Sequence, residues 1–190
     1  MSISPNNTLF HTIPQEQAPK ILNLIVEIEK GGRIKYEYNH ELGILVCDRV
    51  LYGPVHFPVN YCDVPRTWNN SDNDPLDAVV YTTGNIMPGT LVIGRVIGVM
   101  EMIDNNKKDH KIITVNDRDP RFKHITDYKS MREWELKDLK TFFETYKYAQ
   151  TGPKSVKIGK FLPREEAYKI ILESMRNYDE KFKKTNTLLG

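Results

Sequence analysis

The segment Leu91-Val-Ile-Gly94-Arg-Val-Ile-Gly98-Val99 decides the predicted fold. Its aliphatic and β-branched side chains are typical of a strand. Two glycines interrupt it, however, and glycine inside a strand often marks a bulge or a tight bend. A sharply bent strand is what a sheet needs in order to close into a barrel, so this segment predicts a small closed barrel.

Five further apolar runs flank this segment and bring the expected number of strands to six. Gly, Pro, Asn and Asp separate them, and these residues favour turns. Side chains alternate within the runs, so we expect Glu27 to point away from the core and Lys35 to share one face with Glu37. The five runs are residues 22–28, 34–38, 44–51, 78–82 and 112–115.

The last third of the chain has the pattern of two helices. A capping box at Ser130–Glu133 precedes an apolar stripe at Leu139, Phe142, Phe143 and Tyr146, and Gly152-Pro153 ends it. The second helix begins after Pro163 and carries a stripe at Ala167, Ile170, Ile171, Ser174, Tyr178 and Phe182. Strands followed by helices predict a mainly β protein in an α+β arrangement, a closed and mostly antiparallel barrel with two flanking α-helices.

Composition and length indicate one globular domain. The 190 residues are 39% hydrophobic and 27% charged, and 27 Lys and Arg against 25 Asp and Glu leave a formal charge of +2. We expect a single domain over residues 1–190, with loose ends at about 1–18 and 184–190. The longest apolar stretches fall short of the roughly 20 residues of a membrane helix. No secretory signal opens the sequence, so we expect a cytoplasmic protein whose Cys47 and Cys62 are buried free thiols.

The densest chemical signal is Ser71-Asp72-Asn73-Asp74-Pro75-Leu76-Asp77-Ala78, which holds three carboxylates within six residues. Carboxylates this close repel one another, so the cluster requires either a divalent cation among its oxygens or a solvated turn. An EF-hand calcium loop is excluded, because its sixth and twelfth positions, counted from Asp72, would be Asp77 and Thr83 instead of Gly and Glu.

A second acidic group, Asp104 to Asp109, lies between two expected strands, where it is either a polar turn or a part of the same site. Basic and phenolic side chains accompany the acids. Taken singly, Lys35 could merely pair with Glu37, and Tyr146 could be a core residue. Taken as a set, the acids suit hard divalent metals and the bases suit a phosphate-bearing substrate. The bases and phenols in question are Lys35, Arg49, Tyr61, Tyr146 and Lys147.

In these motifs the sequence resembles the soluble inorganic pyrophosphatases of the first family. Asp72-Asn-Asp74-Pro-Leu-Asp77-Ala78 matches the family's diagnostic pattern, and the similarity extends over roughly residues 20–175. The resemblance implies a five-stranded barrel of the oligonucleotide-binding (OB) type. It also implies hydrolysis of pyrophosphate to two phosphates, with several Mg²⁺ ions per site and Mn²⁺ or Zn²⁺ as substitutes. The other matching blocks are residues 26–28, 34–37, 47–49, 57–61, 104–111 and 142–147.

The resemblance also implies a role for each matching residue. Asp74 resembles the general base that accepts a proton from the attacking water. The residues that resemble metal ligands are Asp72, Asp77 and Asp109 for the two tight ions, and Asp104, Glu37 and, through water, Glu27 for ions that arrive with substrate. The residues that resemble phosphate contacts are Lys35, Arg49, Tyr61, Lys111, Tyr146 and Lys147. The chain length resembles that of the shorter, bacterial-type members, which are usually hexamers.

Two departures from the family pattern stand near the site. Phe57 replaces a frequent Tyr, and Cys62-Asp63 replaces a commoner Gly followed by an aromatic residue. The sequence offers no account of the extra charge at Asp63. The histidines show no paired metal-ligand spacing, so a surface or capping role is expected for His11, His40, His56, His110 and His124.

Two other classes of function fit this fold. One is a barrel that binds single-stranded nucleic acid, but at least six acids at the mouth would repel a phosphodiester unless metals intervened. The other is an inactive scaffold, which would be expected to have lost some of the acids or bases. We therefore expect pyrophosphate as the partner, with neither nucleic acid nor a membrane.

Overall fold

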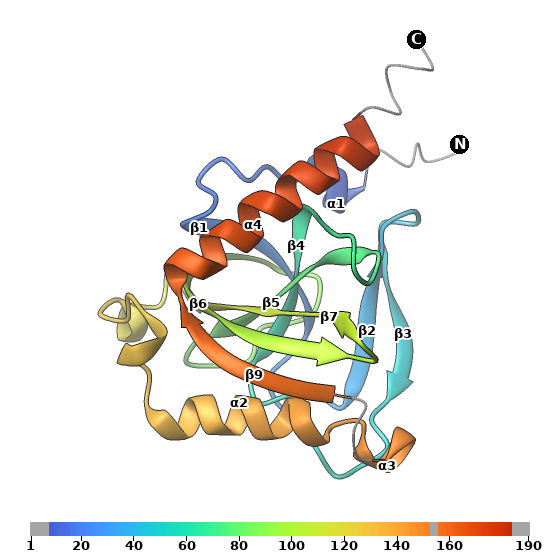
Figure 1. Cartoon of the computed structure of the whole chain (residues 1–190), viewed down its shortest axis with the longest axis vertical. Coiled ribbons are helices and arrows are strands. Elements are labelled where there is room, and N and C mark those ends of the chain that lie inside the picture. The colour runs from blue at the N-terminus through green and yellow to red at the C-terminus, as the bar shows by residue number, and fades with distance from the viewer. Residues whose placement is uncertain (1–7, 153–155, 184–190) are drawn as a thin grey trace.

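In the computed structural model, which describes residues 8–152 and 156–183, five strands close into a barrel (Figure 1). Their spatial order is β1-β4-β5-β8-β6, and β6 pairs back onto β1. Only the β5–β8 pairing among these is parallel. The predicted closed, mostly antiparallel barrel is thus confirmed. The strands are β1 (Ile21–Ile28), β4 (Asn60–Asn69), β5 (Asp74–Tyr81), β6 (Leu91–Asp104) and β8 (Lys111–Asn116).

The two glycines of β6 lie where that strand changes partners. Gly94 pairs with Leu22 of β1 and with Asn116 of β8. At Gly98 the register against β8 shifts, and pairing with β9 (Val156–Pro163) begins. A Cβ at Gly94 would lie 2.6 Å from Leu24 Cδ1, and one at Gly98 would lie 2.8 Å from the Leu162 carbonyl oxygen. Close approach of neighbouring segments therefore requires glycine at both bends.

Three observed strands were not expected from the sequence: β4, β9 and the short β7 (Lys107–Lys108). In β4, Pro65 and the positive φ of 57° at Arg66 accompany a register shift between Val64 and Asn69. This irregularity hides the alternation by which strands are recognised. β5 also begins at Asp74, earlier than the expected 78–82.

A separate hairpin of β2 (Ile34–Asn39) and β3 (Ile44–Val50) stands beside the barrel. Glu27 faces the cavity described below, away from the apolar cluster of Leu22, Leu24 and Val26, and the register of β1 against β4 shifts between Val26 and Ile28. Glu27 is buried at this bulge. The face of β1 that carries Ile25 is covered as well, since Ile25 packs into a cluster with Phe10, Tyr38, Trp68 and Tyr178.

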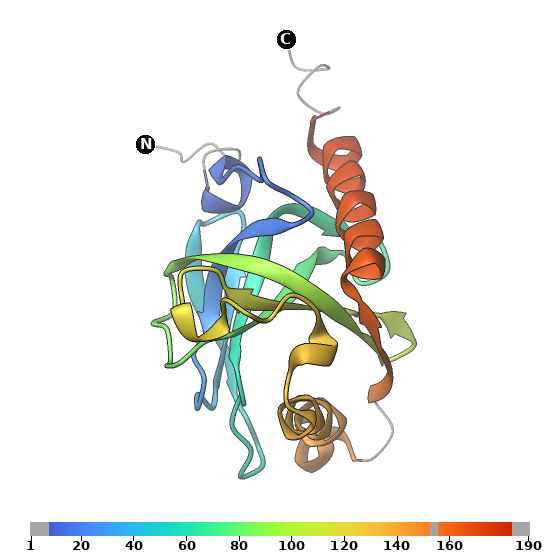
Figure 2. The same cartoon turned by 90° about the vertical axis from the view of Figure 1, so that its left-hand side faces the viewer.

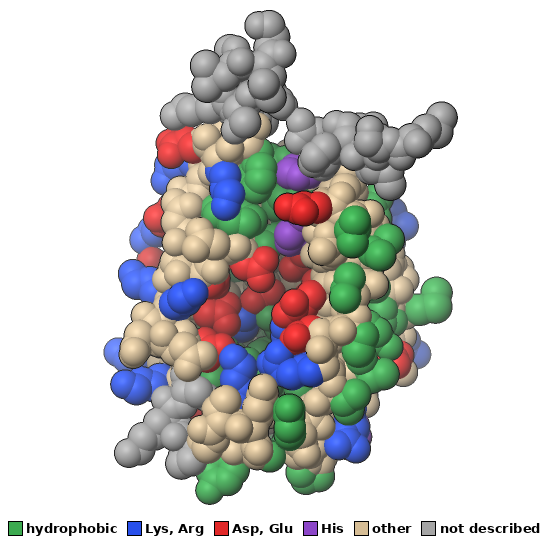
Figure 3. Space-filling view, turned by 90° about the vertical axis from the view of Figure 1, so that its right-hand side faces the viewer, with side chains coloured by type: hydrophobic (Ala, Val, Ile, Leu, Met, Phe, Trp, Pro, Cys, Tyr) green, Lys and Arg blue, Asp and Glu red, His purple; other side chains and the backbone are tan. Residues whose placement is uncertain are grey.

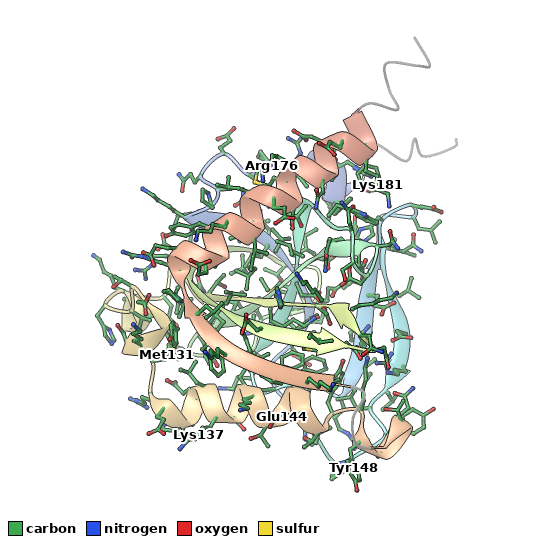
Figure 4. The ribbon with its side chains drawn as sticks, in the orientation of Figure 1. Met131, Lys137, Glu144, Tyr148, Arg176 and Lys181 are labelled. Carbon is green, nitrogen blue, oxygen red and sulfur yellow. The ribbon has the colours of Figure 1, made fainter. Side chains whose placement is uncertain are left out.

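The two predicted flanking helices are α2 (Glu133–Thr145) and α4 (Arg164–Tyr178). Figure 2 views α2 nearly end-on below the barrel, while α4 runs along its side. The cap of α2 lies later than expected: the Glu135 carboxylate accepts a hydrogen bond from the Arg132 backbone N–H. Lys137 lies on the solvent side of α2 (Figure 4). Shorter helical segments are α3 (Tyr148–Thr151), the 3₁₀ turns Pro120–Phe122 and Tyr128–Ser130, and the π-helical Asp179–Lys183.

The expectation of a loose end at about residues 1–18 was wrong for its described part, residues 8–18. Residues Leu9–Thr12 form α1, and Phe10 is fully buried against the barrel. The Gln15 side chain accepts from the Asn23 backbone N–H at 3.0 Å, which ties the following segment to β1. The expected loose ends at 1–7 and 184–190 lie outside the described residues. Cys62 is buried and Cys47 is exposed, and both are free thiols.

Within the described ranges, no helix combines the length and the apolar character that crossing a membrane demands.

Candidate active site

A single cavity of about 910 Å³ gathers all thirteen residues that were singled out from the sequence. Figure 3 faces this hollow: acidic side chains line its walls, lysine and arginine cluster at one end and histidine lies at the other. By element, they are Glu27 on β1; Lys35 and Glu37 on β2; Arg49 on β3; Tyr61 on β4; Asp72 in the β4–β5 turn; Asp74 and Asp77 on β5; Asp104 ending β6; Asp109 just before β8; Lys111 opening β8; and Tyr146 and Lys147 after α2.

The β4–β5 turn is organised by its own polar side chains. The Asn69 side-chain amide donates to Asp72 Oδ2 at 2.9 Å and to the Lys108 carbonyl at 2.8 Å. The Asp74 backbone N–H donates to Asp72 Oδ1 at 3.2 Å, and Asn73 takes a positive φ of 64°. Asparagine tolerates this conformation better than most residues. The turn thus holds Asp72 and Asp74 at the cavity while linking them to the β7 segment.

Lysines and carboxylates interleave across the cavity. Lys111 is almost completely buried and donates to Asp77 and, at 2.6 Å, to Asp109. Two more pairs repeat this arrangement, Lys35 with Glu37 and Lys147 with Asp104. Each of these lysines therefore lies beside an acid of the predicted metal set. A phosphate bound by the lysine would then lie next to a metal ion bound by the acid.

Burial governs the acid–base behaviour of the carboxylates. It raises the pKa of Glu27 to about 8, with the charge of Asp77 adding to the effect. Burial, followed by the charges of Asp109 and Asp77, raises the pKa of Asp72 to about 7. For Asp77 burial raises the pKa to about 6 although Lys111 opposes it. At Asp109 burial is outweighed by Lys111, and the pKa lies below its ordinary value. Such shifts are typical of functional sites.

Two of the tyrosines that line the cavity, Tyr61 and Tyr146, remain neutral donors. Burial raises the pKa of Tyr61 and Tyr146 well above that of a free phenol. Their hydroxyls therefore keep the proton at neutral pH and can donate a hydrogen bond to an anionic oxygen.

Among the cavity residues that sequence reasoning did not assign to the site, Asp63 and His40 lie closest to the predicted acids. Asp63 is only 5% exposed, and one oxygen from each of Glu27, Asp63 and Asp77 lies within 4.8 Å of the other two. His40 Nε2 lies 3.6 Å from Asp74 Oδ1, so the expected surface or capping role was wrong for this residue. His11 also lines the cavity. The available signal for Asp63 was its position two residues after Tyr61, which in a strand places both side chains on one face.

The residues present suit a divalent metal. Asp104 Oδ1 and Asp63 Oδ2 are buried acceptors that have no hydrogen-bond partner among the described residues. Buried polar atoms normally have such a partner, so a cation is a physical reason for their placement. Carboxylate oxygens are also the donors that hard divalent cations prefer.

A family model described as inorganic pyrophosphatase matches residues 24–179. The chain belongs to this family. Soluble inorganic pyrophosphatase 3 of Arabidopsis thaliana is 43% identical over 164 residues, which cover 86% of this chain and 74% of that protein. The crystal structure of the inorganic pyrophosphatase of Thermus thermophilus superimposes with a TM-score of 0.83 at 33% identity, covering 93% of this chain and 99% of that one. The Helicobacter pylori inorganic pyrophosphatase gives the same TM-score and identity, with 88% and 99% covered.

Membership in the inorganic pyrophosphatases makes this chain a hydrolase of the phosphoanhydride class, and it implies pyrophosphate as substrate and a divalent metal as cofactor. The barrel also agrees with the solved pyrophosphatase structures, so the fold inferred from the resemblance is confirmed.

Proposed function

We propose that the chain hydrolyses inorganic pyrophosphate to two phosphates with Mg²⁺, and that water attacks phosphorus directly. The observation that supports this most is the convergence of thirteen acids, bases and phenols from β1 to the end of α2 in one cavity. The new P–O bond forms as the bridging P–O bond breaks, and the electron pair leaves with the second phosphate. A covalent enzyme intermediate is therefore not required.

The proposed metal ligands fall into two groups. Asp72, Asp77 and Asp109 would hold the tight ions, while Asp104, Glu37 and, through water, Glu27 would meet ions that enter with substrate. Bound Mg²⁺ would supply polarisation of the attacking water and compensation of the phosphate charge. Glu27 is already oriented, because its Oε1 accepts a hydrogen bond from the Tyr38 backbone N–H at 2.5 Å.

Asp74 is the proposed general base. It opens β5 with a side chain that is 66% exposed, so its carboxylate can reach a water in the open part of the cavity. There it would accept the proton that the water loses as it attacks.

The bases and phenols are proposed to hold the two phosphoryl groups. Negative charge spreads over the transferred phosphoryl and the leaving phosphate in the transition state, and fixed cations stabilise it. Lys35, Lys111 and Lys147 would act as point charges, and Arg49 could bind two oxygens at once. Tyr61 and Tyr146 would donate neutral hydrogen bonds.

The test is phosphate release from pyrophosphate with Mg²⁺ and after its removal with EDTA. Activity should depend on Mg²⁺, and Asp74→Asn should lower kcat by about 10²- to 10⁴-fold, the usual contribution of general base catalysis. The matched control is Asp138→Asn, since Asp138 is exposed on α2 outside the cavity. Near-normal turnover of Asp74→Asn would remove the proposed base, and wild-type inactivity with Mg²⁺ would refute the function.

We further propose a cytoplasmic homo-oligomer, a hexamer as in the shorter members of the family. Several large apolar side chains on and after the β2–β3 hairpin support self-association, among them Ile44 (54% exposed), Val50 (56%) and Tyr52 (65%). Light scattering would test the mass, and a monomer at micromolar concentration would contradict the proposal.

A further inference from the structure

We propose that Asp63 is a direct ligand of a divalent cation held between Glu27, Asp63 and Asp77. The inference rests on the proposed function and deepens it, because it adds a ligand at a position where the family pattern commonly has an aromatic residue. It also explains why the chain keeps an additional buried carboxylate inside a cavity that is already acidic.

Backbone register brings the three carboxylates together. Asp63 of β4 lies directly opposite Asp77 of β5, and in such pairs the Cβ atoms are about 5 Å apart. On the other side of β4, Glu27 lies at the bulge of β1 where Val26 pairs with Cys62 and Ile28 with Tyr61. Two antiparallel pairings therefore aim three acids at one point from three adjacent strands.

The spacing of the oxygens suits a cation. One oxygen of each residue lies within 4.8 Å of the other two. An octahedral Mg²⁺ or Mn²⁺ with bonds of about 2.1 Å separates its ligand oxygens by about 3 to 4 Å. Asp63 and Asp77 would be the two direct carboxylate ligands, and Glu27 would contact the ion through water, as proposed above.

The unpartnered atom of Asp63 is the second, independent observation. Its Oδ2 is buried and has no hydrogen-bond partner among the described residues, although the residue lines the cavity and is only 5% exposed. The nearest basic group is His40 Nε2 at 3.9 Å, which is too far for a hydrogen bond. Burying a carboxylate oxygen without a partner costs free energy, and a bound cation would offset that cost.

The basic side chains of the cavity are engaged elsewhere. Lys111 is held by Asp77 and Asp109, and Lys35 by Glu37. Within residues 8–152 and 156–183, neither Glu27 nor Asp63 has a lysine or arginine nitrogen within 4.0 Å. Like charges facing each other across a strand pair are destabilising. Of the three acids in this cluster Lys111 compensates Asp77 only, so a cation from solution would supply the positive charge facing Glu27 and Asp63.

The experiment is calorimetric titration of the full chain with Mn²⁺ in the absence of pyrophosphate. Asp63→Asn keeps the shape of the side chain but removes the charge, and it should weaken one class of Mn²⁺ sites by at least about tenfold, since even indirect metal contacts are commonly worth 10- to 100-fold. The matched control is Glu41→Gln, because Glu41 lines the same cavity outside the cluster. It should change Mn²⁺ affinity by less than about twofold.

Thermal unfolding supplies the second readout. Without metal, Asp63→Asn should unfold at a temperature equal to or higher than that of the wild type, because a buried carboxyl group beside other acids is gone, whereas Mn²⁺ should stabilise it less than the wild type. Should Asp63→Asn fail to fold, Asp63→Ser would replace it in both measurements. Unchanged Mn²⁺ affinity and stoichiometry in the variant would overturn the inference and leave shared protons as the means of neutralising the cluster.

Pyrophosphate hydrolysis, assayed separately, distinguishes the two proposals. An active wild type with normal Mn²⁺ binding in Asp63→Asn would refute the Asp63 ligand alone. An inactive wild type would refute the proposed function, whereas the Mn²⁺ titration would still decide whether Asp63 binds a cation.

Discussion

Lys35 is held in place by acids on both strands of the hairpin. Its ammonium group pairs with Glu37 on β2 and lies 3.5 Å from Asp48 on β3. Burial opposes its charge, but Glu37 and Asp48 prevail and raise its pKa above the ordinary value. The side chain is thus a fixed cation at the cavity wall, and little reorganisation is needed when a phosphate oxygen arrives.

We predict that Lys35→Ala lowers kcat as well as kcat/KM, each by about 10- to 100-fold, since hydrogen bonds to charged groups contribute about 1.5 to 3 kcal/mol. A cation that binds developing charge acts on the transition state and not only on the bound substrate. Steady-state kinetics with saturating magnesium pyrophosphate would measure both constants.

The control for this prediction is Lys137→Ala, because Lys137 is an exposed lysine on α2 with only a surface ion pair to Glu133. It should leave both constants unchanged. If saturating substrate restored full turnover to Lys35→Ala, Lys35 would serve ground-state binding alone.

At the residue scale, the sequence predicted which side chains gather in the cavity wherever their order along the chain resembles a known motif. The acids of the 71–78 segment could be expected at one site because their spacing is specific, and all three line the cavity. The roles of Asp63 and His40 could not be expected in this way, because their partners are distant in the chain. The sheet brings Asp77 to Asp63, and the β2–β3 hairpin brings His40 to Asp74. Contacts of this kind depend on register, which composition and periodicity do not determine.

At the scale of elements, β6 is the strand that closes the barrel. Gly98 lies opposite Ile113 of β8 and Pro163 of β9, where the sheet changes from one neighbour to the next. An added methyl group would lie 2.8 Å from the Leu162 backbone oxygen and 3.1 Å from Tyr128 Cβ. Backbone atoms cannot move away as easily as the end of a flexible side chain.

We therefore predict that Gly98→Ala lowers the free energy of unfolding by about 1 to 3 kcal/mol, the usual effect of overpacking. Urea denaturation would measure it. The control is Gly84→Ala, since a Cβ there meets nothing within 4 Å, and its effect should stay within about 0.5 kcal/mol. Equal stability of the two variants would show that the bend in β6 tolerates a side chain.

The strands that escaped prediction share a physical cause. β4 joins a regular half, which pairs with β1 and β5, to an irregular half that contains Pro65 and Arg66. β9 holds Gly159 opposite the Glu101 side chain, whose Oε2 would lie 2.8 Å from a Cβ there. Alternation fails in such segments, whereas regular strands such as β2 and β3 follow the expected bounds closely.

At the scale of the whole molecule, the cavity concentrates carboxyl groups whose pKa is raised, so that they lose their protons only at higher pH. The pKa of Glu27 is raised to about 8 and that of Asp72 to about 7, chiefly by burial, and that of Asp63 is raised well above its ordinary value for the same reason. In the unfolded chain all three carboxyls ionise near pH 4. At these three carboxyls the folded state therefore binds more protons than the unfolded state in the interval from about pH 4 to 8.

The sign of the pH dependence follows from this excess of bound protons. Because the folded state holds protons that the unfolded state has lost, the free energy of unfolding falls as pH rises. The lowered pKa of His11 and His110 acts in the opposite direction, but both groups are almost neutral in either state above pH 7.5. The interval from pH 7.5 to 8.5 thus reports the groups whose pKa burial raises, Glu27 and Asp63 together with the Cys62 thiol, and these act in one direction.

We predict that the metal-free protein, kept in EDTA, loses roughly 1 kcal/mol of stability between pH 7.5 and 8.5. For a domain of this size that corresponds to a fall in Tm of about 2 to 4 °C, measurable by differential scanning calorimetry. Saturating Mg²⁺ should abolish the fall, because metal binding requires ionised carboxylates and strengthens as pH rises. Glu27→Gln should make the metal-free profile less steep, since one of the groups that titrate in this interval is gone. A metal-free Tm that stayed level or rose over the interval would mean that the carboxylates of the cavity are already ionised below pH 7.5, and it would contradict the prediction.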